Sequence, residues 1–300
     1  MIVSASYKTD IPAFYGAWFR RRLDAGYCLM RNPYGGQVYR VGLKPEEVDA
    51  FVFWTKNAGP FLETLDEVQR RGYAFAVQYA INGYPREIEW SVTEAARAAG
   101  HMKRIAERFG ARAAIWRYDT ILASSITDFD FHRANFERLA GMLEGTTDEV
   151  VVSFLQVYKK SQRNMDAAGR LFGFTWNDPE IARKRELLTD LSATARSRGM
   201  KLTVCTQPEL LIEGVVEEAR CIDAMRLSEV AGRWIGAKLR GVREGCACYQ
   251  SRDIGEYDTC PHGCVYCYAV TNRAVARRRW SEHDQECEFL YTERGLRQSI

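Results

Sequence analysis

The hydrophobic pattern of this 300-residue chain alternates between two kinds of segment. Short apolar runs, such as those at 49–54 and 150–157, are typical of strands buried on both faces of a parallel sheet. The longer segments between them place apolar residues three and four positions apart, which is the spacing of an amphipathic helix. The complete set of expected strands is 2–7, 27–31, 37–41, 49–54, 73–81, 111–116, 150–157, 201–205 and 219–223.

Glycine residues end most of the expected helices, as is common at helix C-termini. The pattern predicts helices at 10–26, 59–72, 91–110, 131–143, 180–198 and 269–280, with a long loop or irregular helix between 160 and 180. A repeated order of strand, helix and strand favours parallel strands joined by crossover helices. We therefore expect an α/β fold of the TIM-like (β/α) barrel kind, either complete or incomplete, with a doubly wound open sheet as the alternative.

The alternation breaks down at about residue 238. The remaining sequence is rich in glycine, cysteine and charged residues, and it carries one helical stretch before a charged tail at 281–300. We expect residues 1–237 to form the barrel-like domain. Residues 238–300 are then a cysteine-rich appendage that binds an iron–sulfur cluster and ends in a helix and tail.

Five of the nine cysteines lie between positions 246 and 267. Cys260, Cys264 and Cys267 have the spacing C-x3-C-x2-C, and Gly263 supplies the backbone freedom that a tight turn needs. Thiolates are preferred ligands of iron–sulfur clusters and of zinc. Three thiolates in one turn therefore predict a [4Fe-4S] cluster.

Zinc is the alternative cofactor at this turn. Zinc sites usually combine one C-x2-C pair with a second pair or with histidines, whereas this stretch contains a single C-x2-C. Cys248, or less readily Cys246, is the candidate for a fourth ligand. A fully ligated cluster or a zinc ion would make the protein a non-catalytic module, with the metal as a structural staple or an electron carrier.

The net charge and the lengths of the apolar stretches limit the kinds of partner that we expect. The net charge is only +3, which gives no reason to expect nucleic acid as a partner. No stretch approaches the roughly 18 apolar residues of a membrane span, and the N-terminal run lacks the basic start of a signal peptide. We therefore expect a soluble cytoplasmic protein, in a compartment where thiols stay reduced.

Polar side chains follow the expected strands at the points where they end. Because the carboxyl ends of parallel strands share one edge of the sheet, such residues should line a common pocket. Charged and amide groups of this kind suit a small polar or anionic substrate. The candidate catalytic residues are Lys56, Arg117 and Asp119, and the candidate pocket residues are Asn57, Gln78, Gln156, Lys159 and Glu209.

The spacing C-x3-C-x2-C, with the aromatic Tyr266 before its last cysteine, resembles the signature of radical S-adenosylmethionine (SAM) enzymes. In that family three cysteines hold three irons of a [4Fe-4S] cluster, and SAM binds the fourth iron. The resemblance implies that Tyr266 lies near the SAM adenine, and that the protein needs an electron donor. The Gly-Gly-Glu segment that grips SAM in the family does not follow Cys267.

Several blocks along the whole chain resemble the bacterial proteins grouped as domain of unknown function 1848. The matching blocks are TDIPAFY at 9–15, RNP at 31–33, VFWTKN at 52–57, WRYD at 116–119 and CPHGCVYCYA at 260–269. This family is noted for a C-terminal cysteine cluster similar to that of radical SAM enzymes. Its reaction is not settled, so the resemblance implies a cluster and no particular chemistry.

Overall fold

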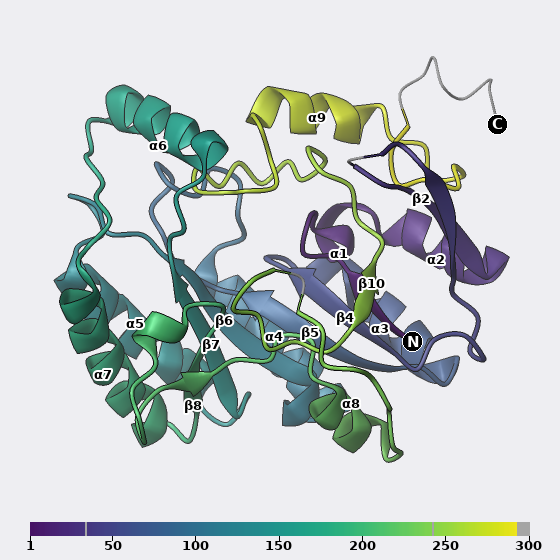
Figure 1. The fold of residues 1–300 in the computed structure, drawn as a ribbon, viewed down its shortest axis with the longest axis horizontal. Helices are drawn as coiled ribbons and strands as arrows, with labels where there is room; N and C mark the ends of the chain where they lie inside the picture. The colour runs from purple at the N-terminus through teal and green to yellow at the C-terminus, as the bar shows by residue number, and fades with distance from the viewer. Residues whose placement is uncertain (34, 242, 293–300) are drawn as a thin grey trace.

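The computed structural model describes residues 1–33, 35–241 and 243–292. Its central element is an eight-stranded sheet in which every neighbouring pair of strands is parallel (Figure 1). The strands are β1 (Ile2–Ala5), β4 (Ala50–Thr55), β5 (Ala74–Ala80), β6 (Ala114–Ile121), β7 (Glu149–Phe154), β8 (Lys201–Val204), β9 (Glu217–Glu218) and β10 (Ser251–Asp253). The expected α/β fold with parallel strands is confirmed.

The strand order of this sheet is β10-β1-β4-β5-β6-β7-β8-β9. From β1 to β9 the order follows the chain, without the reversal that defines a doubly wound sheet. The strands β2 (Tyr27–Arg31) and β3 (Val38–Gly42) stand apart as an antiparallel hairpin. Within the described residues no strand pairing joins β9 to β10, so the sheet is open between these two ends.

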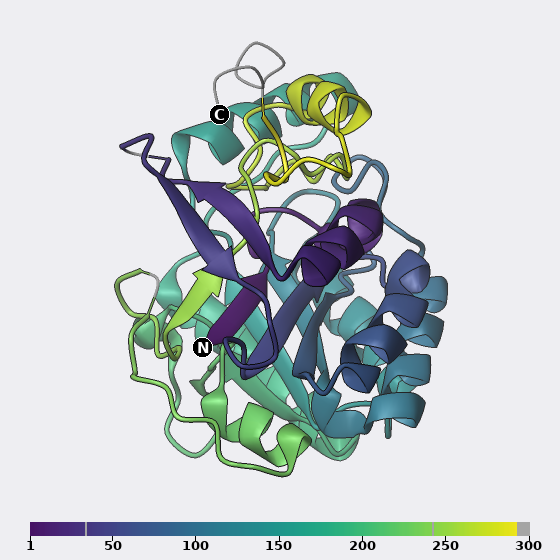
Figure 2. The ribbon, with the colours of Figure 1, turned by 90° about the vertical axis from the view of Figure 1, so that its right-hand side faces the viewer.

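Helices cover one face of the sheet (Figure 2). Side chains of a strand alternate between faces, so Phe53 points toward the helices and Val52 points away. The rings of Phe19 and Phe53 lie 5.4 Å apart, and those of Trp116 and Phe136 lie 4.8 Å apart. The helices on this face are α2 (Gly16–Ala25), α3 (Leu62–Arg70), α4 (Ala95–Phe109), α5 (Phe129–Leu143) and α7 (Ile181–Ser197).

The opposite face is covered by α8 (Ala224–Ala231) and by the chain on either side of it. Here Val52, Ile115 and Val151 from the sheet pack with Cys221 and Cys248 in a second apolar core. The cysteines thus belong to the interior of the fold, next to the strands.

The C-terminal segment returns to the sheet through β10, which pairs with β1. Past β10 the chain crosses the end of the sheet at which the strands finish, where α6 (Lys159–Phe172) and α9 (Arg273–Ser281) both lie (Figures 1 and 2). Arg163 of α6 donates a 2.9 Å hydrogen bond to the carbonyl of Thr271. The expected boundary at residues 237 and 238 therefore separates two stretches of chain that share one sheet.

Some elements differ from expectation. α6 is a regular helix, where a loop or irregular helix was expected, and its first turn is closed by reciprocal contacts between Tyr158 and Ser161. α4 begins at Ala95 and not at residue 91. The short helix α1 (Ile11–Phe14) is separate from α2, where one helix was expected. The strand expected at 219–223 is replaced by the two-residue strand β9, which ends just before residue 219.

None of the helices in the described parts of the chain is long and apolar enough to cross a membrane. Of the charged tail expected at 281–300, residues 293–300 lie outside the described residues. The same holds for residue 34 of the expected turn between β2 and β3 and for residue 242.

Candidate functional site

Three cysteine side chains line one cavity. Cys260, Cys264 and Cys267 all border a space of about 230 Å³ beside α6. Gly263 has a φ of +78°, and a Cβ at this position would lie 2.8 Å from the Arg273 side chain. The turn therefore requires glycine at position 263, as the sequence predicts.

Hydrogen bonds hold the cysteine turn against the carboxyl ends of the strands. His262 Nε2 lies 2.7 Å from Asp10 Oδ2, and the same oxygen accepts a 2.7 Å bond from the backbone N–H of Lys56. Glu89 and Cys264 form an isolated antiparallel β-bridge. The turn is thus fixed to the chain after β1, β4 and β5.

A buried ion pair lies next to the turn. Lys56 Nζ donates to Glu89 Oε1 at 2.8 Å, and the two side chains are 13% and 4% exposed. Burial alone would lower the pKa of Lys56, but the charge of Glu89 and the hydrogen bond to Glu89 raise it above its ordinary value. Lys56 therefore stays positively charged at neutral pH, and it favours the thiolate form of Cys264.

Tyr266 belongs to the same network. Its hydroxyl donates to the Glu89 carboxylate and accepts a 2.9 Å hydrogen bond from Asn82 Nδ2. Asn82 also binds the backbone of Asp119. Its Nδ2 donates to the Asp119 carbonyl at 3.1 Å, and its Oδ1 accepts from the Asp119 N–H at 2.9 Å. Burial and the Glu89 charge raise the pKa of Tyr266, so the hydroxyl stays protonated. Tyr266 therefore connects the cysteine turn to the ends of β5 and β6.

Arg117 and Asp119 point the same way from β6, as their two-residue spacing predicts. Arg117 Nη2 donates to Asp119 Oδ2 at 2.5 Å, and Arg117 Nη1 donates to Gln78 Oε1 at 3.1 Å. Burial alone would raise the pKa of Asp119, but the Arg117 charge and a hydrogen bond from Ser153 lower it. Asp119 is therefore an anion at neutral pH. Its side chain is 23% exposed, against 6% for Arg117, so it is the more accessible partner.

The remaining predicted pocket residues lie outside this network. Asn57 closes a local turn, in which its Oδ1 accepts a 3.1 Å hydrogen bond from Gly59. Gln156 accepts a 2.9 Å hydrogen bond from Arg243. Lys159 and Glu209 are exposed, the first at the start of α6 and the second in the 3₁₀ turn Pro208–Leu210.

Cys246 and Cys248, the candidates for a fourth ligand, lie with a different pair of cysteines. Cys248 Sγ accepts a 3.3 Å hydrogen bond from the backbone N–H of Ile222. Side-chain hydrogen bonds join Cys248 to Cys221 and to Cys246. The sulfur of Cys221 lies 3.4 Å from that of Cys205.

The thiols of the turn are protonated in the metal-free chain. Burial, above all other influences, raises the pKa of Cys260, Cys264 and Cys267. Across residues 1–33, 35–241 and 243–292, no three His, Cys, Asp or Glu side chains are already placed to hold one metal ion. A metal would therefore have to displace the thiol protons and draw the side chains toward a common centre.

Several residues of the network were not singled out from the sequence. Asn82 directly follows an expected strand, so the rule that selected the other strand-end residues also applies to it. Glu89 lies farther along the loop and carried no such signal.

Asp253 of β10 accepts hydrogen bonds from Ser4 Oγ at 2.8 Å and from Ser6 Oγ at 2.9 Å. A role for Asp253 depends on the pairing of β10 with β1, which the sequence does not reveal.

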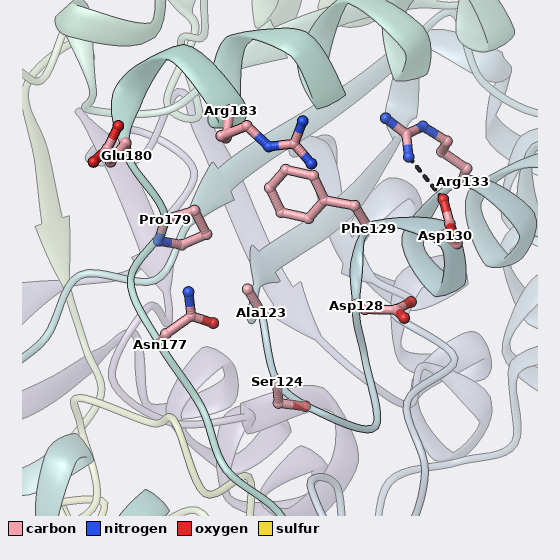
Figure 3. A pocket seen from close by; sticks show the side chains of 10 residues that line it. All are labelled: Ala123, Ser124, Asp128, Phe129, Asp130, Arg133, Asn177, Pro179, Glu180 and Arg183. Carbon is pink, nitrogen blue, oxygen red and sulfur yellow. Dashed lines mark hydrogen bonds and ion pairs between the residues drawn. The ribbon is translucent and has the colours of Figure 1, made fainter.

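A larger and more open cavity, of about 440 Å³, lies between the N-terminal ends of α5 and α7 (Figure 3). The Arg183 guanidinium lies 5.6 Å from the centre of the Phe129 ring, and Arg133 pairs with Asp130 at 2.9 Å. This cavity is lined by none of the site residues expected from the sequence.

Comparison with known proteins gave a match to one family model and remote likenesses to solved structures. The model of the family described as "Domain of unknown function (DUF1848)" matches residues 2–269. No curated protein matches the chain. The crystal structure of a triazine hydrolase variant aligns with a TM-score of 0.29 and 12% identity, over 62% of this chain and 43% of that one. The chain thus spans less than half the length of that hydrolase.

Proposed function

Because this chain belongs to the DUF1848 family, which is described as being of unknown function, we propose a function from the cysteine turn and its neighbours. We propose that Cys260, Cys264 and Cys267 hold a [4Fe-4S] cluster, and that the protein is a radical-SAM-like enzyme acting on a small polar molecule. The observation that carries this proposal is that all three cysteines border one cavity next to a buried cation.

The residues present fit such a cluster. Thiolates are the usual protein ligands of iron–sulfur clusters, and Gly263 lets the turn bend tightly between the first two of them. Cluster thiolates carry negative charge, which the Lys56 ammonium group offsets at close range. When bound, a cluster of this kind supplies an electron to SAM and so initiates hydrogen abstraction from a substrate.

The arrangement of the ionisable groups favours a polar substrate. Asp119 is anionic and partly exposed, so it can accept a hydrogen bond from a substrate hydroxyl or ammonium group. Arg117 fixes the direction of that carboxylate through two hydrogen bonds, from Nε and Nη2. Lys56 contributes the neighbouring positive charge. In this proposal the incomplete barrel positions the substrate, and the cysteine turn closes over the strand ends.

The alternative is a metal-binding module without catalysis, in which zinc or a fully ligated cluster serves as a staple or electron carrier. That alternative requires a fourth thiolate from Cys246 or Cys248. Cys248 instead receives a hydrogen bond from Ile222 and contacts Cys221. This placement supports a turn with three cysteine ligands and one iron available to SAM.

Anaerobic purification tests the proposal. We expect brown protein with about four irons and four labile sulfides per chain, the content of one [4Fe-4S] cluster. Addition of SAM should change the electron paramagnetic resonance spectrum of the reduced cluster, and dithionite as electron donor should drive release of 5′-deoxyadenosine. Colourless protein with zinc bound at the turn would overturn the cluster. An unchanged spectrum without SAM cleavage would overturn the radical mechanism.

A further inference from the structure

A group of four cysteine side chains lies on the face of the sheet that α8 covers, apart from the turn at 260–267. We propose that Cys205, Cys221, Cys246 and Cys248 form a second thiolate site, which binds one zinc ion and ties together the two ends of the open sheet. The proposal stands on the positions of these four residues, and it does not depend on the cluster proposed above.

The four cysteines come from three separate segments that the fold brings together. Cys205 directly follows β8, Cys221 follows β9, and Cys246 and Cys248 precede β10. The sulfurs of Cys205 and Cys221 lie 3.4 Å apart, and side-chain contacts continue from Cys221 to Cys248 and from Cys248 to Cys246. In a tetrahedral zinc site with Zn–S bonds of about 2.3 Å, sulfurs lie about 3.8 Å apart. Among the described residues no three of these side chains already surround one metal position, so zinc binding requires the four side chains to rotate toward a common centre.

The surroundings favour thiolates once a metal is present. Arg117 Nη1 donates to Cys221 Sγ at 2.9 Å, and the backbone N–H of Ile222 donates to Cys248 Sγ at 3.3 Å. The positive charge of Arg243 also interacts with Cys205. A zinc ion with four thiolates has a net charge of −2, and these cations and N–H donors stabilise it by contacting the sulfur ligands.

A redox role fits these cysteines less well. Cys205, Cys221 and Cys248 are each at most 8% exposed and lie in an apolar core. Buried thiols of this kind are poorly accessible to oxidants, whereas reactive cysteines are partly exposed.

The position of the group gives the metal a structural purpose. The sheet is open between β9 and β10, and the four cysteines lie at the chain segments that lead out of β8 and β9 and into β10. The described contacts between these segments include a 2.9 Å hydrogen bond from Tyr249 N–H to the Ile222 carbonyl and the packing of Cys221 with Cys248 in the second apolar core. A zinc ion bound to all four thiolates would add covalent links across this opening, and its binding energy would stabilise the folded chain.

Metal analysis of three variants tests the proposal in the full-length protein, purified without oxygen from cells supplied with zinc. The wild type should carry about one zinc per chain. Cys248→Ser should lose the zinc and keep its iron, whereas Cys264→Ser should keep the zinc. Cys287→Ser, which changes a cysteine outside both groups, is the matched control and should keep both metals. Zinc retained by Cys248→Ser but lost from Cys264→Ser would place the zinc at the turn and overturn the proposal.

Cobalt binding provides a second test, which begins with the wild-type protein. Wild-type protein loaded with Co²⁺ after removal of zinc should show the intense visible bands of a tetrahedral cobalt–thiolate site. Cys246→Ser, which changes the most exposed of the four cysteines, should weaken these bands while circular dichroism stays unchanged. Wild-type protein that binds less than about a tenth of an equivalent of zinc, without cobalt–thiolate bands, would overturn the second site. Iron missing from protein that retains this zinc would overturn the cluster proposal alone.

Discussion

Lys56 Nζ lies 2.8 Å from Glu89 Oε1, and the backbone of Glu89 is in turn bridged to Cys264. The ion pair thus connects the end of β4 to the cysteine turn within three residues. Lys56 is held in place by the carboxylate, and its charge lowers the pKa of the Cys264 thiol beside it against the effect of burial. A strand-end cation and the cysteine motif therefore belong to one site.

We expect Cys264→Ala to abolish iron binding at the turn. A [4Fe-4S] cluster held by three cysteines loses a third of its protein ligands in this variant, so the iron content should fall from about four per chain to near zero. The sheet should remain folded because its main core lies elsewhere. Iron analysis and circular dichroism of anaerobically purified protein measure both outcomes, with Cys287→Ala as control. A variant that keeps its full iron content would contradict the assignment.

Cys248→Ala separates the two proposed roles of the C-terminal cysteines. If three thiolates suffice for the cluster, this variant should keep about four irons per chain and its spectral response to SAM. The physical reason is the contact of Cys248 with Ile222 and Cys221. If the variant loses iron as completely as Cys264→Ala, Cys248 is a cluster ligand and the radical mechanism should be abandoned.

Lys56→Met should destabilise the protein, because it leaves the Glu89 carboxylate buried without its cation. Removing one partner of a buried ion pair costs about 3 kcal/mol or more in the free energy of unfolding. The double variant Lys56→Met with Glu89→Gln should recover part of that loss, since no buried charge then lacks a partner. Urea unfolding of the two single variants and the double variant measures the coupling.

A matched control for this prediction is the exposed pair of Lys201 and Glu217, whose side chains are 54% and 64% exposed. Lys201→Met should change the free energy of unfolding by no more than about 1 kcal/mol, because solvent screens the pair. Equal losses for Lys56→Met and Lys201→Met would show that burial of the Lys56 pair does not matter.

The strands of the sheet could be predicted where burial on both faces leaves a continuous apolar run. The run expected at 49–54 is the observed β4, Ala50–Thr55. β10 could not be predicted, because Ser251–Asp253 is short and polar and is a strand only through its pairing with β1. The predicted start of α4, at residue 91, was wrong for a similar reason. Ser91 belongs to a loop that contacts the C-terminal segment, where it accepts a hydrogen bond from Arg273, and the N-cap of α4 is Glu94.

The residues of the candidate site divide in the same way, into those that a local pattern predicts and those that it does not. Lys56 could be selected because it directly follows β4, and local spacing places Arg117 and Asp119 on one face of their strand. The strand expected to end at residue 116 continues to Ile121, so Arg117 and Asp119 lie within β6 and not after it. Glu89 could not be selected, because it reaches the site through a loop. The grouping of Cys221 with Cys248 depends on how the chain after β9 and the chain before β10 meet on one face of the sheet, and no local pattern encodes that meeting.

The stability of the protein should fall as the pH is lowered from 6.5 to about 4, because of His132. Its imidazole is fully buried, with Nδ1 2.7 Å from the Tyr118 hydroxyl and Nε2 3.1 Å from the Leu122 carbonyl. Burial lowers the pKa of His132 from 6.5 to about 4. Between these values the unfolded chain binds a proton that the folded chain does not, which favours unfolding by up to about 3 kcal/mol. Below pH 4 both states are protonated, and the contribution of His132 stays constant.

Urea unfolding at pH 7.0 and pH 4.5 measures this change. His132→Gln removes the titrating group, so its free energy of unfolding should depend less on pH over this interval, even if the variant is less stable throughout. His101→Gln is the control, because that imidazole is only half-buried and its removal should leave most of the pH dependence in place. If His132→Gln loses as much stability between the two pH values as the wild type does, another group is responsible for the acid sensitivity.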